Sequence, residues 1–345
     1  REWIELEEMV WHAAYREYRD EAYEPFRSSN DIASAARVIL SKSSEGISTM
    51  VANWVRVGFA QGNFNGDNCL IAGRTMDYGP FGWMEEYNPL FAKWTGSGNH
   101  FGFLNQPSAG YANYVVLLES ILPILVAHSD TNNEDYRNEL LERLQQDAQE
   151  LFQRKLDECF RSKLGFFELS TQQDKERIDA LWAELEPLMR RTRVDWTIFW
   201  RRLSHVMKDF NPDTHDASFI LDTLTTTTTT QQQDKSPFYD VLLEPDREDY
   251  KKWISKYTFA VLELGVDTHA AGTRMLQHVN PKYTLREWML VDAYTAAAAG
   301  DDSSLKALYA LVQRPYEEGT EEESKAFYTR APEDALTTGG TAFMS

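Results

Sequence analysis

Cysteine is scarce in this sequence, because its 345 residues include only Cys69 and Cys159. The two form neither a CxxC pair nor a disulfide framework, and no Asn-x-Ser/Thr sequon is present. Both absences favour a reducing, intracellular compartment. The seven histidines show no HExxH motif and no paired ligand spacing, which excludes the usual zinc-site patterns.

The sequence also contains few long apolar runs and fewer basic than acidic residues. The most apolar run, from Tyr114 to Ala127, is interrupted by Glu119, Ser120 and Pro123, and it is too short to span a bilayer. Lysine and arginine number 35 against 54 acids, which gives a net charge of −19. Such a charge argues against nucleic acid or an anionic membrane as the main partner. We therefore expect no nucleic-acid partner and no membrane.

The chain is nevertheless rich enough in apolar residues, at 42%, to fold into a globular protein of one large or two ordinary domains. Apolar residues recur at helical spacing along most of it, which predicts a mainly α fold. The predicted helices cover residues 1–24, 32–41, 46–60, 109–128, 133–161, 173–190, 194–208, 216–224, 247–264, 268–278, 284–299 and 302–313.

One segment, Gly58–Pro80, departs from this helical pattern and is rich in glycine, asparagine and acids. Within it, Cys69–Ala72 is short and apolar enough for a strand, and the Gly-Arg pair that follows predicts a turn to a second strand. Such a hairpin would bring Asp67, Asn68 and Asp77 to one end. Two carboxylates and an amide oxygen form a hard-oxygen site that suits magnesium.

These polar residues also allow two other interpretations. The Asn-Gly-Asp-Asn run and Asp77 are typical of turns and caps that bind nothing. A calcium-binding loop is a further interpretation, because Asn63, Asn65 and Asp67 alternate in sequence as the ligands of such loops do. Arg74, however, stands at the twelfth position from Asn63, where an EF-hand needs a bidentate acid. The EF-hand reading is therefore discounted.

The Asp77-Tyr78-Gly79 triplet is similar to the Asp-Phe-Gly of protein kinases, whose acid holds magnesium against nucleotide phosphates. In ordinary kinases an upstream catalytic acid and an asparagine are separated by four residues. Here Asp67 and Asn68 are adjacent, and Asp77 follows Asp67 by only ten positions. A standard protein kinase is therefore a poor match in detail.

Seven short motifs, in order from about residue 57 to residue 316, resemble those of the selenoprotein O (SelO) family. They are Val57-Gly58-Phe59, Asn65-Gly66-Asp67-Asn68, Thr75-Met76-Asp77-Tyr78-Gly79-Pro80-Phe81-Gly82, Phe103-Leu104-Asn105-Gln106-Pro107-Ser108, Asn280-Pro281-Lys282-Tyr283 with Leu285-Arg286, Gly300-Asp301 and Arg314-Pro315-Tyr316. The number and order of these matches make the resemblance far more specific than the Asp-Tyr-Gly triplet alone.

The resemblance implies a protein-kinase-like fold that binds ATP in an inverted orientation and transfers AMP to Ser, Thr or Tyr hydroxyls of proteins. By position, Asp67 would be the general base. Asn68 and Asp77 would bind Mg²⁺, with Mn²⁺ as an alternative ion, and Asp77 would also lie near the nucleotide phosphates. Expected partners are therefore ATP and protein substrates that carry hydroxyl side chains.

The resemblance also implies an organisation in segments. Residues 1–45 would be a helical lead-in and 46–130 a kinase-like catalytic core with the metal-site hairpin. Residues 131–318 would be a helical C-terminal part and 319–345 a loosely ordered tail. The fold class is thus a mainly α, kinase-like C-lobe with added helices and a small β hairpin at the active site. A Thr/Gln-rich stretch near 224–235 has no apolar face, which predicts a disordered insertion.

The family's nucleotide-binding lobe lies upstream of the region that matches, and the chain starts without a methionine. We therefore expect a C-terminal fragment of a longer protein, and a mitochondrial location by family resemblance. A kinase that transfers the γ-phosphoryl group and a kinase-like pseudoenzyme that serves as a scaffold remain alternatives. The basic end of Trp196–Arg202 is interpreted as a solvated helix edge.

Overall fold

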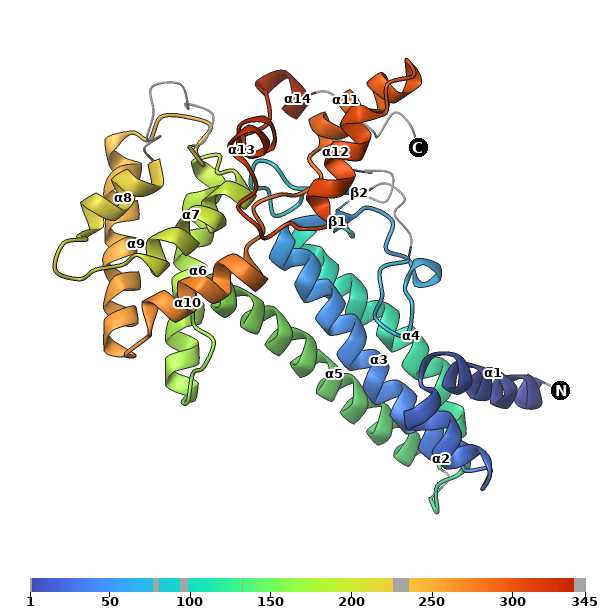
Figure 1. Ribbon diagram of the computed structural model, residues 1–345. Coiled ribbons are helices and arrows are strands. Elements are labelled where there is room, and N and C mark those ends of the chain that lie inside the picture. The colour runs from blue at the N-terminus through green and yellow to red at the C-terminus, as the bar shows by residue number, and fades with distance from the viewer. Residues whose placement is uncertain (1, 77–80, 94–98, 132, 226–235, 338–345) are drawn as a thin grey trace. The chain divides into compact units, whose positions relative to one another are not determined.

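The computed structural model describes residues 2–76, 81–93, 99–131, 133–225 and 236–337. Within these ranges the chain is mainly helical and contains one two-stranded antiparallel sheet (Figure 1). Both features confirm the predicted fold class at this level.

Fourteen α-helices occur in the described ranges, and short π and 3-10 turns connect some of them. The helices are α1 (Glu2–Glu17), α2 (Glu24–Arg27), α3 (Ile32–Val57), α4 (Gln106–Ala127), α5 (Glu134–Lys163), α6 (Gln172–Arg191), α7 (Trp196–Lys208), α8 (Ala217–Thr225), α9 (Glu244–Glu263), α10 (Thr268–Arg274), α11 (Glu287–Ala298), α12 (Ser303–Val312), α13 (Glu321–Phe327) and α14 (Glu333–Thr337). Most predicted helices are confirmed, with ends that differ by a few residues. The segment after residue 319, expected to be loosely ordered, contains α13 and α14.

The sheet pairs β1 (Phe59–Gln61) with β2 (Phe81–Trp83), and Phe59 lies opposite Trp83 in the register. The rings of these two residues are 5.0 Å apart, which adds an aromatic cross-strand contact. The predicted strand at Cys69–Ala72 is wrong, because these residues adopt irregular and turn structure. A strand needs a partner ladder, and in this segment the carbonyl oxygen of Ile71 accepts a hydrogen bond from the Tyr18 hydroxyl instead.

The chain divides into two compact units, each assembled from separate stretches of sequence. Unit 1 comprises Arg1–Asn53, Asn63–Tyr78 and Asn105–Leu156, and unit 2 comprises Trp54–Gly62, Gly79–Leu104 and Asp157–Ser345. The segments predicted from the sequence were consecutive stretches of chain, whereas each of these units combines separate stretches. The predicted segmentation therefore stays a prediction.

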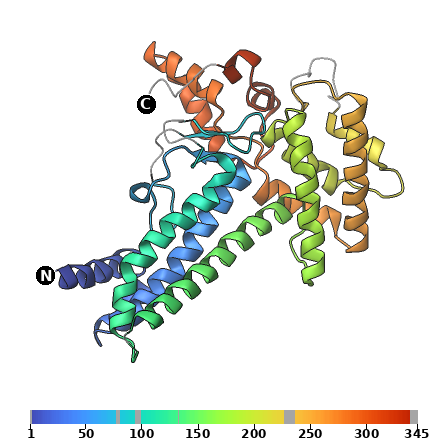
Figure 2. The same cartoon turned by 180° about the vertical axis from the view of Figure 1, so that it is seen from behind.

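Unit 1 is built on α3, α4 and α5, which lie side by side as long helices (Figures 1 and 2). Gly110 of α4 marks the closest approach, because a Cβ at this position would lie 3.1 Å from Val51 of α3 and 3.2 Å from Phe152 of α5. The absence of a side chain thus lets the three helices pack tightly.

Helix α3 runs without interruption from Ile32 to Val57, although the sequence predicted two helices, 32–41 and 46–60. Residues 42–45, which separated the two predicted helices, lie inside the helix. Ser43 and Ser44 are buried, and the Ser43 hydroxyl contacts that of Tyr18 at 3.2 Å. Small residues at these positions permit close packing, and this tertiary requirement overrides their weak helix propensity.

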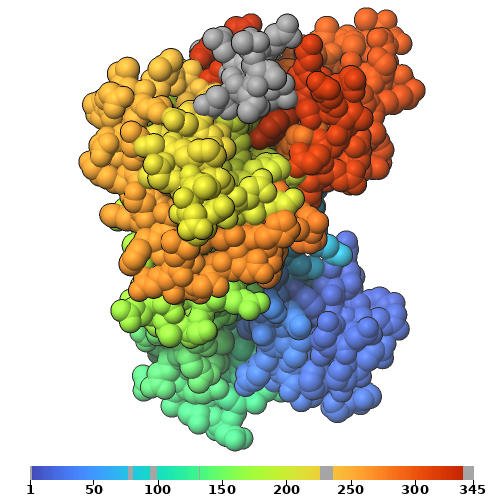
Figure 3. Space-filling view, turned by 60° about the vertical axis from the view of Figure 1, so that its left-hand side comes forward, coloured from blue at the N-terminus to red at the C-terminus, as the bar shows by residue number. Residues whose placement is uncertain are grey.

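Unit 2 is centred on α7, whose first turn is capped by the Asp195 side chain through the N–H of Ile198 at 2.9 Å. Trp196 and Trp200 of α7 are both 1% exposed and pack edge to face at 5.5 Å. Helix α10 approaches α7, and α8 packs against α9 to form one continuous surface (Figure 3). Helices α11 and α12 pack against each other as a pair.

The segment Phe103–Ala127, which includes α4, is long and apolar enough to cross a membrane by length and composition. The argument that this run is too short was therefore wrong, because the helix begins upstream of Tyr114. Half of its most apolar window is buried within the protein, as in the core helix of a globular domain. The expected absence of a membrane partner stays a prediction.

Two sequence-based predictions fall on residues outside the described ranges. Asp77, the proposed second acid of the metal site, is one of them. The other is the Thr/Gln insertion, of which only the beginning, up to Thr225 in α8, is described.

Candidate active site

Asp67 lies in a 3-10 turn, Gly66–Asn68, of unit 1. The N–H groups of Asn68 and Cys69 close this turn by donating to the carbonyl oxygens of Asn65, at 3.0 Å, and Gly66, at 3.3 Å. The Asp67 carboxylate is exposed and makes no hydrogen bond or ion pair within the described part of the chain. It is therefore available to a ligand or substrate.

Asn68 is oriented by its own turn, because its Nδ2 donates to the carbonyl oxygen of Asn63 at 2.7 Å. This bond occupies the amide nitrogen and leaves the amide oxygen as the free acceptor. The side chain is half-buried. The turn thus offers a carboxylate and an amide oxygen on adjacent residues.

The loop that carries the turn is held by side chains of the helices in the same unit. Phe64 is fully buried, and its carbonyl oxygen accepts a hydrogen bond from Nδ2 of Asn113 in α4 at 3.0 Å. The Tyr18 hydroxyl donates to the carbonyl oxygen of Ile71 at 2.6 Å. Anchors on both sides of Asp67 fix the course of the backbone there, although the acid itself is solvated.

The donor set of the turn fits Mg²⁺ in kind, because both candidate ligands present oxygen atoms. In the described ranges, no group of three or more His, Cys, Asp or Glu side chains could hold a metal ion. Asp67 and Asn68 alone supply too few ligands. A complete magnesium site would need further ligands.

Cys69 follows the turn directly and is half-buried. Burial raises the pKa of its thiol to about 11, against a smaller opposing effect of a hydrogen bond with Asn113. At neutral pH the residue is a protonated thiol, which is a poor nucleophile. It acts as a packing residue beside the candidate site.

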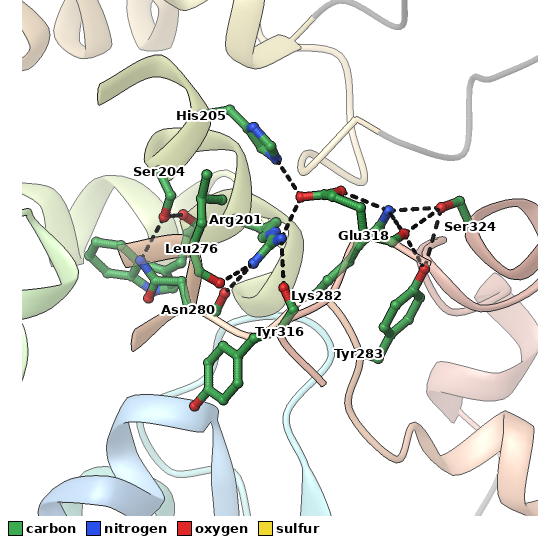
Figure 4. Close-up of polar contacts among 11 residues, drawn as sticks. Arg201, Ser204, His205, Leu276, Asn280, Lys282, Tyr283, Tyr316, Glu318 and Ser324 are labelled. Atoms are coloured by element: carbon green, nitrogen blue, oxygen red, sulfur yellow. Dashed lines mark hydrogen bonds and ion pairs between the residues drawn. The ribbon is translucent and has the colours of Figure 1, made fainter. Parts of the chain in front are cut away.

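Two of the C-terminal motifs, Asn280–Arg286 and Arg314–Tyr316, meet in unit 2 (Figure 4). The backbone N–H groups of Lys282 and Tyr283 donate to the carbonyl oxygen of Pro315, at 2.8 and 3.2 Å. The ammonium group of Lys282 also pairs with Glu318 at 3.0 Å. These motif residues therefore hold the C-terminal segments together.

Arg201 completes this cluster from α7, and its position corrects a sequence-based interpretation. Its guanidinium donates to the carbonyl oxygens of Leu276, at 2.6 Å, and Asn280, at 3.1 Å, and it pairs with Glu318. The side chain is 1% exposed. The Arg201-Arg202 pair in the middle of α7 is therefore not a solvated edge, because Arg201 satisfies buried backbone carbonyls.

A buried ion cluster in unit 2 was not predicted from the sequence. Arg286 donates to both carboxylate oxygens of Asp195, at 2.7 and 3.0 Å, and also to Glu85. All three side chains are less than a tenth exposed. Arg286 belongs to a recognised motif, but its acidic partners are 91 and 201 residues away in sequence. No local pattern could have paired them.

The sequence was compared with protein families and curated proteins. The family model described as "Protein adenylyltransferase SelO" matches residues 8–314. Among the similar proteins is "Protein nucleotidyltransferase YdiU" of Flavobacterium johnsoniae, 31% identical over 86% of this chain and 51% of that protein. The proteins of the same name from Rhodopirellula baltica and Aliivibrio salmonicida are 29% and 32% identical, over 86% and 80% of this chain and 52% and 48% of their own length.

The chain spans about half the length of these curated relatives. The family match covers most of this chain and includes the Asp67 turn, the Arg286 cluster and the motif residues around Lys282. The chain therefore belongs to the SelO family of protein adenylyltransferases.

Proposed function

We propose that this chain supplies the catalytic base and the metal ligands of a protein adenylyltransferase, which transfers AMP from ATP to Ser, Thr or Tyr hydroxyls. Asp67 is the base in this proposal, and Asn68 and Asp77 hold Mg²⁺ or Mn²⁺. The observation that carries it is the exposed Asp67 carboxylate, free of partners in the described ranges and next to Asn68. The family match over residues 8–314 supports the reaction type.

In the proposed reaction, the hydroxyl oxygen of the substrate protein forms a bond to the α-phosphorus of ATP. The bond between that phosphorus and the oxygen leading to the β-phosphate breaks, and pyrophosphate leaves. Asp67 accepts the hydroxyl proton as the new bond forms. A bound divalent cation would offset the negative charge on the phosphate oxygens.

The surroundings of Asp67 suit a base of this kind. A carboxylate that is already paired would have to break that interaction before it could accept a proton. The anchors of the loop, Tyr18 with Ile71 and Asn113 with Phe64, limit backbone movement and so help to orient the carboxylate.

We further infer a protein-kinase-like arrangement in which this chain forms the C-terminal lobe. The relatives are about twice as long as the matched region. Groups that cradle the nucleotide would then come from chain outside this sequence. On this proposal, the isolated chain binds Mg-ATP weakly or not at all.

The test uses ATP labelled at the α- or the γ-phosphate, with the longest product of the gene that encodes this chain. Label from α-labelled ATP should enter protein in the presence of Mg²⁺, and chelation of the metal should stop it. Asp77→Ala should abolish incorporation, because the metal ion that offsets the phosphate charge then loses one of its ligands.

Other results would favour the alternatives. Incorporation from γ-labelled ATP alone would identify a kinase instead. No incorporation from either label, together with no binding of Mg-ATP by calorimetry, would favour a pseudoenzyme that serves as a scaffold. Full activity of Asp77→Ala would refute the proposed metal ligand.

A further inference from the structure

A cavity of about 260 Å³ lies in unit 2, away from the Asp67 turn in sequence. Its walls come from the loop after β2, from the first turn of α11 and from the start of α14. The lining residues used below are Glu85, Glu86, Phe91, Lys93, Glu287 and Leu336. No part of the proposed reaction uses this cavity.

Glu85 is the unusual residue of the lining. One of its carboxylate oxygens accepts a hydrogen bond from Arg286, but the other, Oε1, is buried and has no partner within the described ranges. The side chain as a whole is 8% exposed. A buried carboxylate oxygen without a donor is costly. Such a group calls for an explanation, and a ligand in the adjoining cavity is one.

The charges around the cavity favour a positively charged ligand. Arg286 uses two bonds for Asp195, so Glu85 and Asp195 share a single guanidinium. Lys93 does not correct this imbalance, because its ammonium pairs with Glu287 at 3.0 Å. When Glu85 and Asp195 are both ionised, one negative charge of the Glu85–Asp195–Arg286 cluster is therefore left over.

The cavity wall already accommodates one cation, which indicates the chemistry that fits. The Lys93 ammonium lies 5.7 Å from the centre of the Phe91 ring, within the range of a cation–π contact, and only 18% of the side chain is exposed. Glu85 is a second carboxylate in the lining of this cavity, and its Oε1 accepts no hydrogen bond from Lys93 or any other donor within the described ranges.

We propose that this cavity binds a guanidinium or primary ammonium group, and that a rotation of the Glu85 carboxylate brings its buried Oε1 to an N–H of that group. The indole N–H of Trp288, which also lines the cavity, lacks an acceptor within the described ranges. A cationic group cannot accept a hydrogen bond from this indole N–H. The acceptor is therefore a carbonyl oxygen of the ligand or a water molecule beside it. The proposal is independent of adenylyl transfer.

The binding should depend on pH through Glu85. Burial, and then the charge of Asp195, raises the pKa of this carboxyl to about 7, while Arg286 and Lys93 oppose the rise. Tyr239 and Tyr328 are further titratable groups close to the cluster. A carboxyl with a pKa of about 7 is about one-tenth ionised at pH 6 and nine-tenths at pH 8, so the apparent affinity should rise about tenfold.

The experiment is a calorimetric titration of the 345-residue chain with methylguanidinium and methylammonium, at concentrations that leave it folded. Tetramethylammonium, which has the charge but no N–H, is the control ligand. We expect the first two to bind and tetramethylammonium to bind at least about tenfold more weakly, because it cannot donate to Oε1.

Three variants make the test specific. Glu85→Gln should weaken methylguanidinium binding at least about tenfold and remove its pH dependence. Glu86→Gln removes the same charge from the neighbouring lining residue, whose carboxylate is held by Arg193 at 3.0 Å, and should change binding less than about threefold. Leu336→Trp should block the cavity from α14 without touching the ion cluster, which keeps the test valid if Glu85→Gln fails to fold.

The source of the cation is resolved by a second pair of ligands, a short peptide with one arginine and the same peptide with citrulline in its place. Tighter binding of the arginine peptide than of methylguanidinium assigns the site to a protein side chain, and equal or weaker binding assigns it to a small molecule. The proposal is overturned if neither cation binds, in which case water alone fills the cavity. It is also overturned if Leu336→Trp binds as the wild type does.

Discussion

Gly73 lies against the backbone of Gly46 in α3, so closely that a Cβ on Gly73 would be 2.1 Å from the carbonyl carbon of Gly46. Gly73 also has a φ of +66°, a conformation that other residues rarely adopt. Both residues belong to unit 1. The loop that carries Asp67 is therefore seated on helix α3 through a contact that admits no side chain.

Gly73→Ala should destabilise the chain by about 2–3 kcal/mol, because the methyl group adds a backbone clash to the strain of a positive φ. Urea unfolding followed by circular dichroism measures the loss. Gly265→Ala is the matched control, since Gly265 has a φ of +61° but a Cβ added there would meet no atom within 4 Å. The control should lose only about 1 kcal/mol, and equal losses would refute the role of the Gly46 contact.

Asp67→Asn should leave stability within about 0.5 kcal/mol of the wild type, because the exposed carboxylate has no partner in the described ranges. In the adenylyl-transfer assay, the same variant should lose at least about 100-fold in rate, since the amide cannot accept the hydroxyl proton. Asp130→Asn, at another solvent-accessible position, should keep both properties. A stable Asp67→Asn protein with normal activity would exclude Asp67 as the base.

Cys69 should react slowly with iodoacetamide. A thiol with a pKa of about 11 is almost entirely protonated at pH 8. The rate should therefore be on the order of a hundredfold lower than that of an ordinary peptide cysteine. Mass spectrometry of the Cys159→Ser variant measures Cys69 alone. Modification at the rate of a peptide cysteine would contradict the burial of this thiol.

Arg286→Met should cost about 3–5 kcal/mol of folding free energy, because the carboxylates of Asp195 and Glu85 would remain buried without their counter-charge. Arg191→Met removes an arginine that also bridges two acids, but the Arg191 side chain is 47% exposed. This control should lose less than about 1 kcal/mol. Denaturant unfolding of both variants provides the comparison, and similar losses would contradict the special cost of the buried cluster.

Glu85→Gln should also change how stability depends on pH. Burial raises the folded-state pKa of Glu85 to about 7, above its unfolded value, so the folded chain binds this proton more tightly. This tighter proton binding stabilises the folded chain fully below about pH 4.5. The stabilisation, up to about 3 kcal/mol, is lost as the pH rises through about 7. Relative to the wild type, Glu85→Gln should therefore gain stability between pH 5 and pH 8, as measured by unfolding at each pH.

Glu318→Gln provides a comparison of opposite sign. A hydrogen bond from His205 and the charges of Arg201 and Lys282 lower the pKa of the Glu318 carboxyl. Its stabilising effect is present above the unfolded pKa and is lost as the pH falls toward the lower folded value. The wild type should therefore lose its advantage over Glu318→Gln in acid. The same pH response from both variants would refute the assignment of these shifts.

Much of the fold could be predicted from the sequence, because helical periodicity is a local property. The patterns predicted nearly all the long helices, and seven short motifs, the one around Asp67 among them, led to the family. The strand at Cys69–Ala72 and the break in α3 were predicted wrongly for a common reason. Local patterns suggested an apolar strand and two separate helices, but contacts with Tyr18, Asn113 and Gly46 determined the structure.

By itself, the sequence determined the helical class, the family and the candidate residues Asp67, Asn68 and Asp77, since each rests on residue types at short spacings. Only the tertiary structure decided which charges are buried together. Arg286, Asp195 and Glu85 meet across up to 201 residues of chain, and Arg201 is buried where a solvated edge was predicted. Burial and distant pairing depend on how helices pack, and packing is a property of the whole fold rather than of any local stretch.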